Sequence, residues 1–376
     1  MNVIMILDNA FEPDVRVYNE AKSLIEHGHT VEILCYDGRG QFLNKPIEII
    51  DGIKIRRFFM RSKIGTFFTD KLSFKFHLLF YPIWLIKFYI ACKKYIKSIN
   101  QTIDYIYSHD LICATASSIF FKRYKKVFDM HELYKKTEKD HIYNLISKRA
   151  MGFSQKRAKF IVHVNNEQKK MSNNSFYDKM IELPNYPILS KYTIEKTTEK
   201  FTVSYIGLVR RDDLILNLCE ALRDIDCNVK IYGKGLSDIA ANKVNSYNNA
   251  HYYGSFDGAK EAKKLFVDCD LLYSLYDPSD LNWKTAMPVK FFEAMASGTP
   301  VIASMNTVYG DFVIQNKLGY VIKWDSIDEI RQSVNSAMQN KKHYQELRNH
   351  CIEIRYRFSW SDKIDEFIKI LEEQAI

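Results

Sequence analysis

Residues 282–304 read NWKTAMPVKFFEAMASGTPVIAS: a polar loop, a short helix and an apolar strand in succession. Pro288 at the first helical position and Gly298 just past the last one are typical start and stop signals of a helix. The apolar strand 300–303 follows at once. The positions that recur at helical spacing, and are expected to face a core, are Val289, Phe292 and Met295–Ala296.

Lys290 and Glu293 lie on a different face of the same helix, near its start. A helix N-terminus offers unpaired backbone N–H groups and partial positive charge, so it suits a phosphate. A cation and a carboxylate beside it can hold the rest of a nucleotide. The spacing leaves an ordinary surface ion pair between the two residues as the alternative.

The composition is that of a globular chain with two domains. The 376 residues are 47% hydrophobic and 14% aromatic, which is enough to bury substantial cores. The net charge of +9 favours an anionic partner, and a phosphorylated substrate, anionic lipid and nucleic acid all meet that requirement. The seven cysteines are scattered and form no C-x-x-C pair, so we expect small core residues in a reducing compartment.

The beginning of the chain, MNVIMILDNAF, has no basic leader, so we expect a first strand and not a signal peptide. No stretch reaches the roughly 20 apolar residues needed to span a bilayer. A cytoplasmic protein is therefore expected.

The first half opens with a strand–helix–strand unit, in which a helix from Val15 to Glu26 joins strands at 3–7 and 31–35. No Gly-x-Gly-x-x-Gly follows the first strand. Arg16 lies at the strand-to-helix junction, where ligands of open α/β sheets bind, and a salt bridge with Glu20 is the alternative. Further strands are expected at 53–59, 105–107, 127–130, 160–164 and 180–183.

Two histidines follow predicted strands. His131, with Glu132 after it, stands at the carboxyl end of the strand 127–130, where active sites form, although a buried structural histidine is the alternative. The pair does not continue as H-E-x-x-H, which excludes a zinc-protease site. His109 is expected in a loop at 108–110, before a helix at about 111–123.

Residues 71–97 mix aromatic side chains with lysines. A basic aromatic helix of this kind can lie in a membrane interface, with lysines on anionic lipid. A pair of helices that covers the sheet, with the lysines merely solvated, is the alternative.

The second half repeats the α/β pattern after a polar linker at 189–200. Gly207, Gly233 and Gly254 each follow a predicted strand, so three backbone turns are expected to line one crevice. A basic pair, Arg210-Arg211, follows the first of these turns. Asp268-Cys269-Asp270 has the D-x-D form of some metal sites, but it leads directly into an apolar strand, so we expect no metal there.

The accumulated motifs resemble the GT-B glycosyltransferases, and within them the retaining family-four enzymes. The motifs span nearly the whole chain, and PVKFFEAMASGTPVIAS, which is similar to P-x-K-x-x-E-x-M-x-x-G-x-P-V-I-A, is the most specific. The other segments that carry the resemblance are LDNAFEPDVRVYNEAKSLIEHGHTVEIL, FDMHEL, LPN, SYIGLVRRDD, IYGKG, YYGSFD and RYRFSWSDKIDEFI.

The resemblance implies an α/β fold of two Rossmann-like domains that face across a cleft. These are an acceptor-binding domain at 1–188, a linker at 189–200, a donor domain at 201–355, and a terminal helix at 356–376 that packs back on the first domain.

The resemblance also implies roles for particular residues. Glu293 would accept hydrogen bonds from the ribose of a nucleotide-sugar, while Arg210 and Lys290 would neutralise its diphosphate. His131 would sit beside the donor sugar. The remaining donor contacts would be Gly207, Gly233, Gly254 and Ser255, and the acceptor or phosphate side would hold Arg16, Glu132 and His109.

One departure concerns the donor sugar. Many relatives carry a second glutamate eight residues before the ribose-binding one, and Thr285 stands there in this chain. The implied reaction is retaining sugar transfer from a nucleotide-sugar to a glycan or lipid-linked acceptor hydroxyl, without a metal or other cofactor. A nucleotide-sugar 2-epimerase and a non-catalytic nucleotide-sugar binding protein are the alternatives. Nucleic acid is not expected as a partner, because the basic residues are spread and no binding module is recognised.

Overall fold

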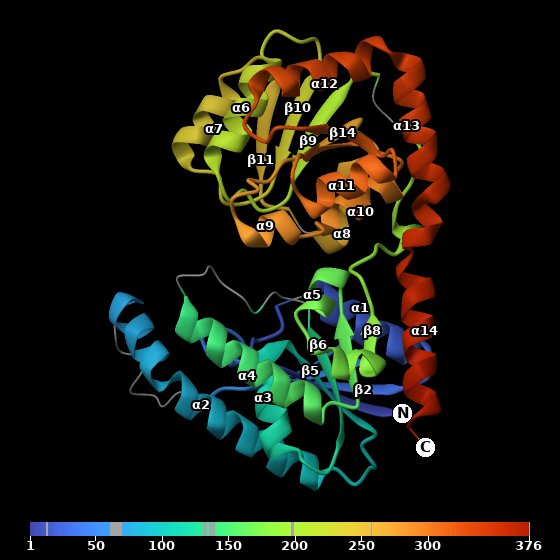
Figure 1. Cartoon of the computed structure of the whole chain (residues 1–376). Helices are drawn as coiled ribbons and strands as arrows, with labels where there is room; N and C mark the ends of the chain where they lie inside the picture. The colour runs from blue at the N-terminus through green and yellow to red at the C-terminus, as the bar shows by residue number, and fades with distance from the viewer. Residues whose placement is uncertain are drawn as a thin grey trace. The chain divides into compact units, whose positions relative to one another are not determined.

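The computed structural model describes residues 1–12, 14–60, 70–130, 134, 140–196, 199–256 and 258–375, without the side chains of 70–79, 259, 260, 262 and 263. The chain divides into two compact units. The first comprises Met1–Pro184 and Asp362–Ile376, and the second comprises Asn185–Ser361. Each unit is built on its own, largely parallel sheet, as the mixed α/β expectation requires (Figure 1).

The first unit contains a sheet in the order β3-β4-β2-β1-β5-β6-β7-β8, parallel except for the antiparallel pair β3 and β4. The chain moves outward from β1 through β2 to β4, then returns to the other side of β1 with β5. The point where the strand order reverses, between β1 and β5, is where open α/β sheets bind ligands. The strands are β1 (Asn2–Leu7), β2 (Thr30–Tyr36), β3 (Ile47–Ile50), β4 (Ile53–Phe58), β5 (Tyr105–His109), β6 (Lys125–Met130), β7 (Phe160–His163) and β8 (Met180–Glu182).

The helices of the first unit begin with α1, whose predicted bounds are confirmed. Asp14 caps it by accepting hydrogen bonds from the backbone N–H groups of Arg16 and Val17. Gly28, at a φ of 81°, lets the chain turn into β2. The helices are α1 (Val15–Glu26), α2 (Asp70–Ser98), α3 (Asp110–Phe120), α4 (His141–Arg157) and α5 (Asn166–Lys170), followed by the 3-10 turn η2 (Asn174–Lys179).

Several sequence predictions for this unit need correction. His109 is the last residue of β5 and not part of a loop, because the parallel pairing with β6 continues to Asp129. The segment 71–97 lies in one long helix, α2, and not in a pair. The sequence reading also missed β3, a short edge strand, and α4.

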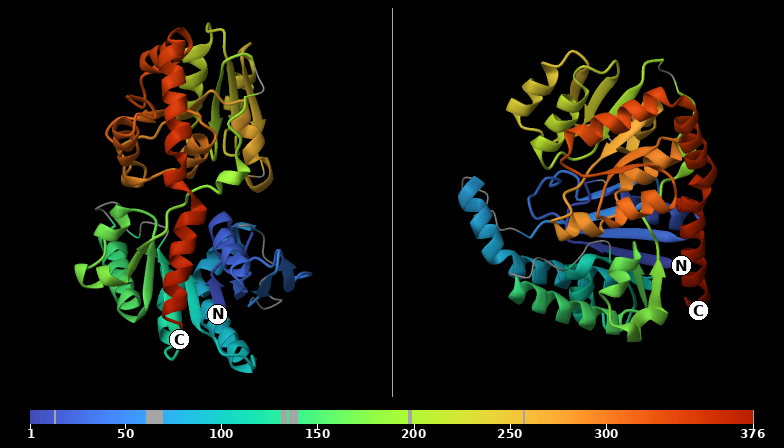
Figure 2. Two further views of the ribbon diagram at one scale, coloured as in Figure 1. Left: turned by 90° about the vertical axis from the view of Figure 1, so that its right-hand side faces the viewer. Right: turned by 45° about the horizontal axis from the view of Figure 1, so that its top comes forward.

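The C-terminal helix α14 (Trp360–Glu373) contributes Asp362 onward to the first unit and lies beside its sheet (Figure 2). The Tyr105 hydroxyl donates a hydrogen bond to the Leu371 carbonyl at 2.9 Å, and Tyr107 meets Phe367 edge to face. These contacts bury one side of β5 under the end of the chain.

The second unit has a fully parallel sheet in the order β11-β10-β9-β12-β13-β14, which reverses between β9 and β12. Its strands are β9 (Thr202–Ile206), β10 (Asn228–Tyr232), β11 (Ala250–Gly254), β12 (Leu271–Ser274), β13 (Val301–Ser304) and β14 (Gly319–Ile322). Its helices are α6 (Asp212–Leu222), α7 (Asp238–Asn245), α8 (Gly258–Val267), α9 (Leu281–Thr285), α10 (Val289–Ala296), α11 (Val308–Gln315), α12 (Ile327–Gln339) and α13 (Lys341–Ile354), with 3-10 turns η3 (Leu189–Lys191) and η4 (Arg355–Phe358).

Two apolar clusters cover the faces of this second sheet. One packs α6, α7 and α12 against it, and the other packs α8, α10, α11 and α13 against the opposite face. All seven cysteines are buried and free, as predicted for small core residues. Among the described residues, no helix is long and apolar enough to cross a membrane.

Candidate active site

Three glycine turns meet at the carboxyl ends of β9, β10 and β11 in the second unit. The backbone N–H of Gly207 donates to the Tyr232 carbonyl at 2.9 Å, and that of Gly233 donates to the Gly254 carbonyl at 2.6 Å. Gly233 has a φ of 143°, and a Cβ atom there would overlap the carbonyl oxygen of Gly207. Only glycine fits this close approach, so the three turns lie together and form one backbone surface.

Lys290 reaches this surface from the first turn of α10. Its ammonium nitrogen lies 4.3 Å from the ring centre of Tyr205 and 5.8 Å from that of Tyr276. It also lies 2.9 Å from where a Cβ atom of residue 207 would stand. Tyr205 belongs to β9 and Tyr276 follows β12, so the ammonium group sits at the reversal point of the sheet.

The ion pair between Lys290 and Glu293 that the spacing left open does not form. Among the residues that the structure describes, Lys290 has no carboxylate partner, and its charge rests on two aromatic rings instead. Burial alone would lower the pKa of Lys290, but Tyr276 and Tyr205 outweigh it and hold that pKa above its usual value. The side chain therefore presents a full positive charge at the switch point.

Arg210 and Arg211, the basic pair that follows β9, lie in different environments. Arg211 pairs with Asp213 at 2.5 Å and with Asp277 at 2.8 Å, and it lies over the Trp324 ring. Arg210 is exposed and forms no ion pair with any described residue. Of the two arginines, Arg210 is the one available to an anionic ligand.

Glu293 lies one turn after Lys290 on α10 and is held by a residue that is distant in the sequence. The hydroxyl of Tyr192 donates to Glu293 Oε1 at 2.7 Å. Burial raises the pKa of Glu293, while the hydrogen bond from Tyr192 and the charge of Lys290 oppose that rise. Tyr192 lies in the stretch 189–200 that the sequence predicts to be a polar linker, where no site residue was expected.

The start and end of α10 agree only in part with the sequence prediction. Pro288 is the N-cap and not the first helical residue, and no side chain caps the helix start. Phe292, Met295 and Ala296 are buried as predicted, but Val289 is 44% exposed, because it lies in the open first turn. Gly298, at a φ of 68°, follows the helix C-cap.

Three further positions that the sequence singled out lie in the same unit: Thr285, Ser255 and Asp270. Thr285 ends the short helix α9, and its hydroxyl donates to the Leu281 carbonyl at 2.8 Å. Ser255 is exposed beside the Gly254 turn. In the D-x-D segment, Asp270 accepts hydrogen bonds from the Thr202 backbone N–H and the Tyr344 hydroxyl.

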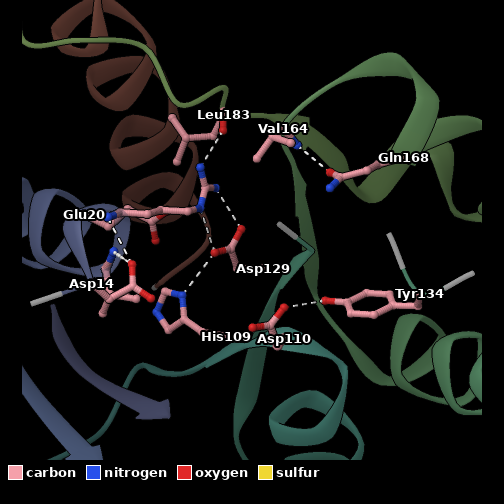
Figure 3. A network of polar contacts seen from close by, with 11 residues as sticks. Asp14, Glu20, His109, Asp110, Asp129, Tyr134, Val164, Gln168 and Leu183 are labelled. Carbon is pink, nitrogen blue, oxygen red and sulfur yellow. Dashed lines mark hydrogen bonds and ion pairs between the residues drawn. The ribbon is translucent and has the colours of Figure 1, made fainter. Parts of the chain in front are cut away.

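In the first unit, the residues at the reversal point form a buried ionic network (Figure 3). Arg16 makes a two-pronged pair with Asp129, at 2.9 Å from Nε and 2.8 Å from the second terminal nitrogen. It also contacts Glu20 at 3.0 Å and donates to the Leu183 carbonyl at 3.0 Å. The salt bridge with Glu20, which the sequence left open, is therefore present.

His109 completes this network. Its Nδ1 atom lies 3.0 Å from Asp129, and its ring stacks on Tyr107 at 4.7 Å. Burial raises the pKa of Glu20 against the opposing effect of Arg16. Burial would lower the pKa of Arg16, but Asp129 and Glu20 outweigh it and raise that pKa.

Glu20, His109 and Asp129 offer ligand atoms that all lie within 4.8 Å of one another, close enough for a metal ion. The guanidinium of Arg16, however, already contacts both carboxylates. It supplies the positive charge that a divalent cation would bring, and the two cations would repel each other. The arrangement favours an ionic network over a metal centre.

His131 and Glu132 lie outside the described residues, so their predicted positions beside the donor sugar and on the acceptor side stay predictions. The structure adds three residues that the sequence analysis did not single out: Tyr192, Tyr205 and Tyr276. Tyr205 lies near the end of β9, and Tyr276 follows β12. Because ligands bind where these two strands end, the position of both tyrosines at predicted strand ends is a signal that could have identified them.

Comparisons with known proteins agree with this geometry. Residues 192–357 match the family model described as "Glycosyl transferases group 1". Over 161 residues the chain is 29% identical to chitobiosyldiphosphodolichol beta-mannosyltransferase of Candida glabrata, a match over 41% of this chain and 34% of that protein. The chain thus matches about a third of the length of this curated relative.

Solved structures resemble the whole chain. Sucrose-phosphate synthase from Thermosynechococcus elongatus superposes with a TM-score of 0.74 at 14% identity, over 99% of both chains. Anabaena Alr3699/HepE in complex with UDP-glucose gives 0.69 at 14% identity, again over 99% of both chains.

The fold is therefore that of the GT-B glycosyltransferases, with two Rossmann-like units, as the sequence predicted. Within this class, the match to the glycosyl transferases group 1 model covers residues 192–357, and the resemblance stated from the sequence is confirmed. The glycine turns, Lys290, Arg210 and Glu293 all lie inside the matched segment.

Proposed function

We propose that this protein is a glycosyltransferase that moves a sugar from a nucleotide-sugar donor to an acceptor hydroxyl. One observation carries the proposal: two cations, Lys290 and Arg210, have no carboxylate partner among the described residues and flank the glycine turns at the switch point. A nucleoside diphosphate is the anionic ligand that such a surface fits, since the N-terminus of α10, which no side chain caps, and two cations lie at the carboxyl ends of these strands.

Sugar transfer places negative charge on the diphosphate as the glycosidic bond breaks. Lys290 and Arg210 would stabilise that charge more in the transition state than in the ground state, which accelerates the reaction. Glu293, behind them on α10, would accept hydrogen bonds from the ribose hydroxyls. The known ligand of Alr3699/HepE, UDP-glucose, supports a nucleotide-sugar donor here.

We further propose that transfer retains the configuration of the anomeric carbon, with the leaving phosphate helping to deprotonate the acceptor, and needs no metal. Beside these cations, the described residues that we assign to the donor site include one carboxylate, Glu293, which accepts a hydrogen bond from Tyr192, rather than a pair of carboxylates for a glycosyl-enzyme route. The related Candida glabrata protein is named a beta-mannosyltransferase, so the product configuration of this chain is a decisive measurement. The acceptor would be a glycan or lipid-linked glycan in cell-surface polysaccharide synthesis, on the cytoplasmic side of the membrane.

A nucleotide panel tests the core of the proposal. Thermal-shift assays with UDP, GDP, ADP and CDP should show stabilisation by one of them, because a ligand that binds only the folded state raises the melting temperature. The matching nucleotide-sugars are then tested for donor hydrolysis and transfer, with product configuration read by NMR. Stabilisation by none of the four would refute the proposal. Binding without transfer would favour a binding protein, and sugar epimerisation without an acceptor would favour a 2-epimerase.

Lys290→Met should reduce transfer about 100-fold, the scale of losing one preorganised charge contact at a developing anion. Methionine is unbranched and only one atom shorter than lysine, so it can still pack over the Tyr205 ring and the fold should remain intact. Arg223→Met, which removes an exposed arginine of the same unit paired only with its helical neighbours, is the control. Equal rates for the two variants would argue against the role of Lys290.

We also propose that α2 contacts an anionic membrane surface. Its core-facing side buries Phe88, Tyr89, Cys92 and Ile96, so part of the aromatic content is structural. The opposite side exposes a stripe at helical spacing, formed by Ile83, Ile86, Lys87, Ile90, Lys93, Lys94 and Lys97. Isoleucines followed by lysines along one face suit insertion at a lipid interface.

Co-sedimentation with vesicles tests this contact. The wild-type chain should pellet with vesicles that contain phosphatidylglycerol and stay in solution with phosphatidylcholine alone, because each lysine near an anionic surface contributes about 1 kcal/mol. Replacing Lys93 and Lys94 by glutamate should abolish pelleting, whereas the same change at the exposed Lys341 and Lys342 of the second unit should not. Absence of wild-type pelleting would exclude the proposal.

A further inference from the structure

The hydrogen bond between Tyr192 and Glu293 joins the candidate site to a segment outside it. Tyr192 belongs to a stretch of chain, residues 189–196, that leads from the unit boundary to the first strand of the second unit. We call this stretch the strap. Its tyrosine is 101 residues away in the sequence from the carboxylate that it contacts at 2.7 Å.

Hydrogen bonds from two charged side chains, Arg348 and Lys196, connect the strap to the residues around α10. Arg348 donates to the Ile194 carbonyl and, at 3.2 Å, to the Gly298 carbonyl just past the end of α10. Lys196 donates to the Cys269 carbonyl and, at 3.3 Å, to the Thr299 hydroxyl. These bonds tie the strap to the residues just after α10 and just before β12, so they restrain the position of Tyr192 relative to Glu293.

The hydroxyl of Tyr192 is a donor in this contact. Burial and the charge of Glu293 raise the pKa of Tyr192 far above its usual value, so the phenol stays protonated. Its ring meets Phe266 edge to face, which restricts its rotation. The carboxylate of Glu293 therefore has one oxygen, Oε1, bound by a rigid donor.

The second oxygen of Glu293 accepts no hydrogen bond from any described residue. A carboxylate has about four lone-pair sites, and one bond from Tyr192 leaves the others free for a ligand. A fixed carboxylate loses less conformational freedom on binding than a mobile one, so it binds hydroxyl groups more tightly.

We propose that Tyr192 is a positioning residue that holds the Glu293 carboxylate in the orientation that accepts the ribose hydroxyls of the nucleotide. This inference depends on the role given to Glu293 in the proposed function. It adds a specific consequence: the preference for a ribonucleotide over a 2′-deoxynucleotide depends in part on the strap.

The test compares ribo- and 2′-deoxyribonucleoside diphosphates of whichever base binds the wild-type chain. Tyr192→Phe removes only the hydroxyl and keeps the ring against Phe266. Affinity for the ribonucleotide should fall about tenfold or more, the effect of one hydrogen bond to a charged group, while affinity for the 2′-deoxynucleotide, which lacks one of the two hydroxyls that contact Glu293, should fall less. A purely structural role would weaken both ligands equally.

Tyr247→Phe is the matched control, because the Tyr247 hydroxyl donates to Glu220 at 3.0 Å in the same unit, on α6. It should leave both affinities unchanged.

The pH dependence gives an independent readout. The groups that face Glu293 are Tyr192 and Lys191 of the strap and Lys290 of α10. Burial raises the pKa of Glu293 and Tyr192 lowers it, so loss of the hydroxyl should raise that pKa further. Ribonucleotide binding needs the ionised carboxylate and is lost as the pH falls through this pKa. In Tyr192→Phe this loss should occur at a higher pH than in the wild type.

The outcomes separate the two proposals. No nucleotide binding by the wild-type chain would overturn the proposed function itself. Wild-type binding with an unchanged ribose preference and pH profile in Tyr192→Phe would overturn only the inference about Tyr192. Tighter ribonucleotide binding in the variant would also overturn it, because Tyr192 would then compete with the ribose for Glu293.

Discussion

Replacement of Glu293 by alanine is expected to reduce sugar transfer by about 10³-fold and to weaken nucleotide binding, while the fold is retained. Two hydrogen bonds from ribose hydroxyls to a carboxylate contribute about 1.5–3 kcal/mol each, and about 1.4 kcal/mol corresponds to a factor of ten. The variant would also leave the Tyr192 hydroxyl without its acceptor. The unsatisfied hydroxyl costs about 1–3 kcal/mol of folding stability, with or without ligand, so it does not account for the loss of affinity.

The measurements for Glu293→Ala are nucleotide affinity by calorimetry, transfer rate, and the circular dichroism spectrum. Glu220→Ala is the control, because Glu220 also accepts a hydrogen bond from a tyrosine hydroxyl, on α6. It should leave affinity and rate unchanged. Unaltered nucleotide affinity in Glu293→Ala would contradict the assignment of the ribose contact, whatever happens to the rate.

Asp129→Ala is expected to destabilise the first unit by about 3–5 kcal/mol, the cost of removing one partner from a buried ion pair. Asp129 is fully buried and accepts two bonds from the Arg16 guanidinium, so its loss leaves a buried cation next to Glu20. For a unit of this size, each kcal/mol lowers the melting temperature by about 2–4 °C. A shift of roughly 10 °C or more in the transition of the first unit should follow.

Differential scanning calorimetry measures this shift for each unit of the intact chain. Glu167→Ala is the control, because Glu167 pairs with the exposed Lys170 on the surface of the same unit. An exposed pair contributes about 0–1 kcal/mol, so this variant should melt near the wild type. Equal melting temperatures for the two variants would mean that Arg16 finds other partners when Asp129 is removed.

The sequence predicted those parts of the molecule that depend on local signals. The helix Val15–Glu26 has a capping aspartate at its start and a glycine after its end, and it was placed correctly. The helix α10 was recognised from Pro288 before its start and Gly298 after its end. Val289 shows the limit of periodicity, because the first turn of a helix can be open to solvent although its spacing matches the core.

The parts that were missed depend on contacts between distant residues. The sequence left two roles open for Arg16, a ligand contact and a salt bridge with Glu20. It could not indicate Asp129, which accepts two hydrogen bonds from Arg16 and is 113 residues away in the sequence. Tyr192 contacts Glu293 across a similar separation, and nothing in its polar neighbourhood indicates a site. The strand β3 has only four residues and pairs antiparallel at the sheet edge, so its local sequence signal is short.

The interlocked turns of Gly207, Gly233 and Gly254 also limit how this protein can be altered by mutation. A side chain at position 233 would displace the neighbouring backbone, and one at 207 would push the ammonium group of Lys290 aside. A library that randomises these two positions should therefore return glycine almost exclusively among active clones. Diversity in donor preference, natural or engineered, is expected at exposed neighbours such as Ser255, which can change without moving the main chain.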